Sequence, residues 1–118
     1  MITWNNLDKL TSYQELEKTE SVDLAAVMAG ENGAERVKNY SVPMAEGLAY
    51  NYAAKKVDDT VLAALEKLAE EAQLTEKFEA LYNGEVVNTG EKRLVLHHMT
   101  RGQLGDAVEA DGVDKRTF

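Results

Sequence analysis

The strongest constraint on the fold is an apolar stripe of helical period between Asp58 and Gln73. Apolar residues recur there three or four positions apart, and charged residues fill the positions between them. The stripe consists of Val61, Leu62, Leu65, Leu68, Ala69 and Ala72. Asp58 or Asp59 is suited to accept hydrogen bonds from the free amides at the start of such a helix. The pattern predicts an amphipathic helix over residues 58–73.

A different period occupies residues 40–52, where apolar and polar or small residues alternate on both sides of Ala45-Glu46-Gly47. Alternation of this kind around a short loop predicts a β-hairpin, with Gly47 at a position that needs positive φ. Pro43 has no amide proton to donate to a ladder, so its strand should lie at a sheet edge. The hairpin tyrosines are interpreted as core residues.

Shorter helical signals flank these two elements. They cover Leu7 to Leu16, where Ser12 and Glu15 have capping-box spacing, then residues 24–29, 34–39 and 75–82. We expect Ser21 or Asp23 to precede the second of these helices and Gly30 to end it in a left-handed conformation. Residues 86–90 are expected to be extended. The predicted fold class is α+β and mainly α, with several short helices and one β-hairpin at about residues 40–52.

The charge balance bears on the class of partner. A formal net charge of −8 repels phosphate backbones and anionic lipid surfaces, so neither nucleic acid nor a membrane is an expected partner. The chain has no cysteine, which excludes disulfides and thiol nucleophiles. Met1 to Trp4 lack the basic and apolar regions of a signal peptide. These features favour a cytoplasmic location.

His97 and His98 are the only histidines, and they are adjacent. Neighbouring side chains point to opposite faces of a strand or diverge by about 100° on a helix, so both rings rarely reach one metal ion. Adjacency also supplies neither the partner nor the orienting group of a catalytic dyad. We therefore expect no metal site here, and we expect one imidazole to be packed and hydrogen-bonded while the other lies near the surface.

Two further patterns receive structural interpretations. The glycines after Tyr82 match neither the dinucleotide fingerprint nor the P-loop, so they are interpreted as turn residues. Glu66, Glu70 and Glu71 belong to the solvated face of the predicted helix. No cofactor site is expected. The residues by themselves describe a small acidic domain, and one interpretation is a stand-alone small acidic helical interaction module.

A longer run of residues points to a known family. It reads Phe78-x-x-Leu81-Tyr82-Asn83-Gly84-Glu85-Val86-Val87-Asn88-Thr89-Gly90-Glu91-Lys92-Arg93-Leu94-Val95-Leu96-His97. This run resembles the amino-terminal region of the glucose-6-phosphate isomerase (phosphoglucose isomerase) family, in which a helix end is followed by Gly-Glu, an apolar pair, Asn and then Glu-x-Arg-x-Val-Leu-His. Tyr52-Ala53-Ala54-Lys55-Lys56-Val57 is similar to the family's hairpin exit, and the resemblance extends from about Asp23 to Arg101.

The resemblance implies an amino-terminal subdomain of a larger α/β sugar-isomerase-type enzyme. Residues 1–101 would form the helical subdomain with its hairpin, and residues 102–118 a connecting segment toward downstream domains. The family interconverts glucose 6-phosphate and fructose 6-phosphate through an enediol intermediate. Its catalytic residues and phosphate loop lie beyond the matched region, so we expect no catalytic residue in this chain and no activity from it alone.

The resemblance also carries expectations about partners and site residues. The implied partners are the downstream domains of the same polypeptide, a hexose phosphate bound only by the full enzyme, and a second copy in a homodimer of the parent. Arg93 and His97 match the Arg and His of the family run. They are expected to support the cleft of the whole enzyme rather than to react with substrate.

Overall fold

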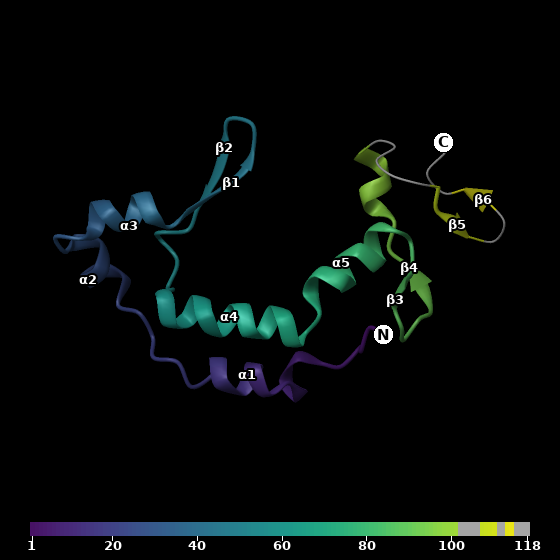
Figure 1. Cartoon of the computed structure of the whole chain (residues 1–118), viewed down its shortest axis with the longest axis horizontal. Helices are drawn as coiled ribbons and strands as arrows, with labels where there is room; N and C mark the ends of the chain where they lie inside the picture. The colour runs from purple at the N-terminus through teal and green to yellow at the C-terminus, as the bar shows by residue number, and fades with distance from the viewer. Residues whose placement is uncertain (102–106, 111–112, 115–118) are drawn as a thin grey trace. The chain divides into compact units, whose positions relative to one another are not determined.

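The computed structural model describes residues 1–101, 107–110 and 113–114 (Figure 1). Its contacts divide the chain into two compact units. One unit is Thr11–Lys67, and the other combines Met1–Leu10 with Leu68–Phe118. The expected boundary between residues 101 and 102 stays a prediction, because residues 102–106 lie outside the described residues.

Helices alternate with short antiparallel strand pairs along the chain. The helices are η1 (Leu7–Lys9), α1 (Thr11–Leu16), α2 (Leu24–Ala29), α3 (Gly33–Asn39), α4 (Asp59–Glu71), α5 (Leu74–Tyr82) and η2 (His97–Arg101), where η denotes a 3-10 helix. The strands are β1 (Ser41–Ala45), β2 (Leu48–Asn51), β3 (Val86–Asn88), β4 (Arg93–Leu94), β5 (Glu109–Ala110) and β6 (Val113–Asp114). They pair as β1-β2, β3-β4 and β5-β6. The predicted mainly α fold with a hairpin is confirmed.

In the Thr11–Lys67 unit, helix α2 begins as predicted at Asp23, whose Oδ1 accepts a hydrogen bond from Ala26 N at 3.1 Å. The expected left-handed end at Gly30 is wrong, because Gly30 has φ −72° and ψ 172°. Gly33 N donates to Gly30 O at 3.0 Å, which closes a tight turn before α3. The steric need for glycine falls at Gly33, where a Cβ would collide with the carbonyl of Met28.

The predicted hairpin is confirmed as β1 and β2, with Val42 opposite Tyr50 and φ +74° at Gly47. Its base is tied to α3, since Asn51 Nδ2 donates to Val37 O at 2.7 Å. The interpretation of the tyrosines as core is wrong for Tyr50, which is 46% exposed. The described part of the chain places no layer over the outer part of this two-stranded sheet, and such a sheet cannot bury its own side chains.

Arg36 of α3 holds the segment that joins β2 to α4. Its Nε donates to Ala53 O at 2.9 Å, and its Nη2 donates to Lys55 O at 3.0 Å and to Val57 O at 2.7 Å. The segment then enters α4 through Asp58, whose Oδ1 accepts from Val61 N at 2.8 Å. Of the two predicted caps, Asp58 is therefore the one used.

In the other unit, α5 begins after Gln73, which has φ 54° and ties down the amino terminus. Gln73 Oε1 accepts from Thr3 N at 2.8 Å, and Lys77 Nζ lies 5.4 Å from the centroid of the Trp4 ring. The helix ends as predicted at Asn83-Gly84, and Gly84 has φ +77°. Of the extended segment expected over residues 86–90, strand β3 confirms Val86–Asn88, whereas Thr89 and Gly90 lie in the turn that follows.

The core of the described residues is thin. Apart from Met99, its buried apolar side chains are those of alanine and valine, and no large side chain in the described part of the chain is completely enclosed. They are Val22, Ala53, Ala72, Ala80, Met99 and Val108. Large apolar side chains such as Met44, Leu48 and Phe78 are instead 63–69% exposed. Within the described residues, no helix is both long and apolar enough to cross a membrane.

Candidate functional site

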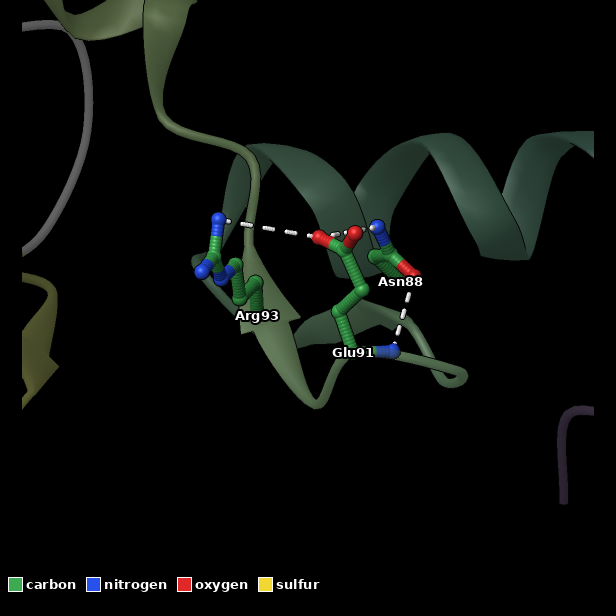
Figure 2. A network of polar contacts seen from close by, with 3 residues as sticks. All are labelled: Asn88, Glu91 and Arg93. Atoms are coloured by element: carbon green, nitrogen blue, oxygen red, sulfur yellow. Dashed lines mark hydrogen bonds and ion pairs between the residues drawn. The ribbon is translucent and has the colours of Figure 1, made fainter.

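The β3-β4 turn carries the polar residues of the run that resembles the isomerase family. Asn88 organises it, because its Oδ1 accepts from Glu91 N at 3.2 Å and its Nδ2 donates to Glu91 Oε2 at 3.4 Å (Figure 2). The chain then passes through Lys92 with φ 55° into β4. The side chain of Asn88 thus fixes the direction of the Glu91 carboxylate.

Arg93 is the second partner of that carboxylate. Its Nη1 lies 3.7 Å from Glu91 Oε2, and Figure 2 shows both side chains on the same side of the turn. The Arg93 side chain is 76% exposed and that of Glu91 is 63% exposed. An ion pair so accessible to water contributes little to stability. Its effect is to present a guanidinium and a carboxylate side by side at the surface.

His97 and His98 begin η2 and have different surroundings. His97 is exposed, and its backbone carbonyl accepts from Thr100 Oγ1 at 2.8 Å. His98 is half-buried, with its ring stacked on that of Tyr82 at a centroid distance of 5.0 Å. His98 Nε2 is 3.1 Å from Tyr82 O. The prediction of one packed and one surface imidazole is confirmed.

The contact with Tyr82 defines the neutral tautomer of His98. A carbonyl oxygen only accepts, so Nε2 carries the proton and donates it to Tyr82 O. Nδ1 is then the acceptor nitrogen, and it is buried without a hydrogen-bond partner among the described residues. The ring of His98 packs η2 against the end of α5. It is not placed to act as a base for a ligand in solvent.

Arg93 and His97 thus lie at exposed positions in neighbouring segments, each with a different partner. Within the part of the chain that the structure describes, no cluster of three acidic, histidine or cysteine residues is arranged to hold a metal ion. The residues near the β3-β4 turn can contact a neighbouring surface or an anion. They lack the enclosed base and cation that proton transfer on a sugar requires.

A cleft that sequence reasoning missed lies in the Thr11–Lys67 unit. It has a volume of about 740 Å³, and its walls include Glu31, Glu35, Arg36, Tyr40, Tyr52 and Asp59. Tyr40 stacks on Tyr52 with centroids 5.1 Å apart and donates its hydroxyl proton to Asp59 Oδ1 at 3.0 Å. Burial and then the bond to Asp59 raise the pKa of Tyr40. No spacing in the sequence signals this cluster, because its members come from separate elements.

Comparison with known proteins gives the class. The family model described as phosphoglucose isomerase matches residues 51–117 of this chain, which is more than half of its length. The match includes the end of the hairpin, α4, α5 and the whole β3-β4 turn. The chain belongs to the phosphoglucose isomerase family.

Three similar proteins are each named glucose-6-phosphate isomerase. The glucose-6-phosphate isomerase of Treponema denticola is 52% identical over 120 residues, which cover 98% of this chain and 23% of that protein. The glucose-6-phosphate isomerase of Treponema pallidum is 45% identical over 100 residues, covering 85% of this chain and 19% of that protein. The one from Borreliella afzelii is 38% identical over 120 residues, covering all of this chain and 22% of that protein.

These matches settle the choice between the two interpretations of the sequence. The chain spans about a fifth of the length of the curated relatives it matches. Short helical patterns that resemble the family by chance do not give 52% identity over 120 residues. The family resemblance is confirmed, and it extends before Asp23, because the Treponema denticola match covers 98% of the chain.

Proposed function

We propose that this chain is the amino-terminal part of a glucose-6-phosphate isomerase, the enzyme that interconverts glucose 6-phosphate and fructose 6-phosphate. The observation that carries the proposal is the ordered match to the Treponema denticola enzyme, which takes in nearly the whole chain but less than a quarter of that enzyme. The proposed role of the chain is to support the catalytic domains that the remaining polypeptide supplies.

The 118-residue chain is proposed to be inactive by itself. Isomerisation moves a proton between C1 and C2 of an open-chain sugar, which needs a carboxylate base, a cation for the developing oxyanion and a loop that holds the phosphate. The sequence contains no phosphate-binding loop motif. The guanidinium of Arg93 lies on an exposed turn beside Glu91, where water screens both charges.

Arg93 and His97 are proposed to support the cleft of the complete enzyme from outside it. Both are exposed and lie within the run that matches the family, so their polar atoms are accessible to a neighbouring domain. The hexose phosphate substrate, a homodimer of the complete enzyme and a cytoplasmic location belong to the same proposal. Membership of the family supports these three parts of the proposal.

An isomerase assay tests the proposal directly. The 118-residue chain is assayed with fructose 6-phosphate beside a chimera in which this chain replaces the matching segment of the Treponema denticola enzyme. We expect turnover by the chimera and none by the 118-residue chain. Turnover by the short chain would contradict its inactivity, and a chimera that neither folds nor turns over would contradict the assignment to this enzyme.

A further inference from the structure

The hairpin and the start of α4 share an uncovered apolar surface. On the hairpin it consists of Val42, Met44, Leu48 and Tyr50, and on α4 of Leu62 and Leu65. We call this surface the hairpin apolar face. Val42 lies opposite Tyr50 in the ladder, and the register shifts between Pro43 and Ala45. Leu48 is two positions from Tyr50 along β2, and Met44 is two positions from Val42 along β1, so we place both on the side of that pair.

Most of this surface is exposed. Val42 is 44% exposed, Met44 69%, Leu48 65% and Tyr50 46%. A groove of about 300 Å³ continues the face, and its lining includes Val42 and Tyr50 of the hairpin and Leu62 and Leu65 of α4. Lys55 is the charged residue in its lining, although the chain as a whole is acidic. Contiguous apolar surface of this kind on a soluble protein marks a site of contact.

We propose that the hairpin apolar face is a docking surface within the complete isomerase. Its occupant is the part of the polypeptide that the curated relatives have in addition to the segment they share with this chain. The inference rests on the proposed function and names the surface through which support is given. The relatives are four to five times as long as the segment they share with this chain, so each has ample polypeptide to cover the face.

Charge argues against a second copy of the 118-residue chain as the occupant. Each copy carries a formal charge of −8, so two copies repel as they approach. An apolar surface supplied by the same polypeptide does not have to approach as a separate charged molecule. Its docking therefore costs no translational freedom. A docked domain also gives the two-stranded sheet the cover that it lacks among the described residues.

Met44→Glu tests the inference, with Ala49→Glu as the matched control. Met44 is the most exposed side chain of the face, whereas Ala49 is exposed on the same hairpin but points to the opposite side. Both variants are made in the 118-residue chain and in the chimera with the Treponema denticola enzyme. Thermal unfolding is measured for all, and isomerase activity after heating for the chimeras.

The expected pattern differs between the two backgrounds. In the 118-residue chain, both variants should unfold at the temperature of the unsubstituted chain, because water already reaches both positions. In the chimera, Met44→Glu should bury a carboxylate without a partner and lower the activity that survives heating about tenfold or more. Ala49→Glu should leave it unchanged.

Three results would overturn the inference. An active chimera that tolerates Met44→Glu as well as Ala49→Glu would contradict the docking of a domain on this face and leave the proposed function intact. A 118-residue chain that dimerises in sedimentation experiments and becomes monomeric with Met44→Glu would assign the face to a second copy. An inactive, unfolded chimera without either substitution would remove the proposed function and this inference with it.

Discussion

The ring of His98 stacks on the ring of Tyr82 with centroids 5.0 Å apart, while His98 Nε2 donates to the carbonyl of the same Tyr82 at 3.1 Å. One histidine therefore holds both the side chain and the backbone of the residue that ends α5. Its neighbour His97 is exposed and accepts the Thr100 hydroxyl through its backbone carbonyl. The two adjacent histidines thus have different roles: the His98 side chain packs against α5, whereas His97 makes its contact through its backbone.

His98→Ala should lower the free energy of unfolding by about 1–2 kcal/mol, because it removes an aromatic stack and a hydrogen bond. His97→Ala is the matched control and should change it little, as is usual for exposed positions. Urea unfolding followed by the fluorescence of Trp4, the single tryptophan and a residue of the same unit, measures both. Equal losses from the two variants would show that His98 is not the residue that packs.

Arg36→Lys should loosen the segment between β2 and α4. The guanidinium donates to three carbonyls of this segment and lies with its Cζ 4.3 Å from the Tyr40 ring centroid. An ammonium cannot reproduce that fork, so we expect a loss of about 1–3 kcal/mol in the local opening free energy. Hydrogen exchange at the amides of Lys55 and Val57 reports it. Lys38→Ala, at an exposed position of the same helix, should leave both amides protected.

Gly84→Ala should destabilise the chain by more than Gly47→Ala. Both glycines have positive φ, +77° at Gly84 and +74° at Gly47, so alanine costs about 1–2 kcal/mol at either. A Cβ at Gly84 would in addition overlap the side chain of Val108, whereas nothing lies within 4 Å of one at Gly47. Thermal unfolding compares the two variants.

The double variant Gly84→Ala with Val108→Ala separates the two causes. Removing the Val108 methyl groups relieves the overlap, so Val108→Ala should cost less in the Gly84→Ala background than it does in the unsubstituted chain. Simple addition of the two losses would show that the backbone conformation alone sets the requirement for glycine at this position.

Local chemistry made several elements predictable. The apolar stripe of α4, the alternation around Gly47 and the acidic cap at Asp23 each act within a few residues, and each is found where the sequence places it. Gly30 shows the limit of such reasoning. A glycine at a helix end permits a left-handed conformation, yet the close approach at Gly33 to the carbonyl of Met28 decides the turn.

The site was less predictable for a related reason. The run that includes Arg93 and His97 was found through its resemblance to a family, but their exposure depends on the packing of β4 and η2. The cluster of Arg36, Tyr40 and Asp59 joins a helix, its C-cap and a distant helix, and no local pattern encodes such a meeting. Tyr50 was misassigned because alternation identifies an apolar face without stating whether the chain itself covers it.

Tyr40 makes a contribution to the stability of the chain that is lost at alkaline pH. Burial first, and then the hydrogen bond to the Asp59 carboxylate, raise the pKa of Tyr40 above its ordinary value of 10.0. The folded state then binds the phenol proton more tightly than the unfolded state does. The resulting stabilisation is fully present below pH 10.0 and is lost as the pH rises through the folded-state pKa.

Tyr40→Phe tests this dependence. The variant lacks the hydrogen bond to Asp59, so it should be less stable than the unsubstituted chain at neutral pH, and the difference should shrink above pH 10.0. Unfolding experiments at neutral and alkaline pH measure the difference, and tyrosinate absorbance identifies the titration that disappears. Asp59→Asn should move that titration back toward its ordinary value, because it removes the neighbouring charge and leaves Tyr40 half-buried as before. A gap between the two chains that widens with rising pH would contradict the assignment, since it would mean that the folded state favours the ionised phenol.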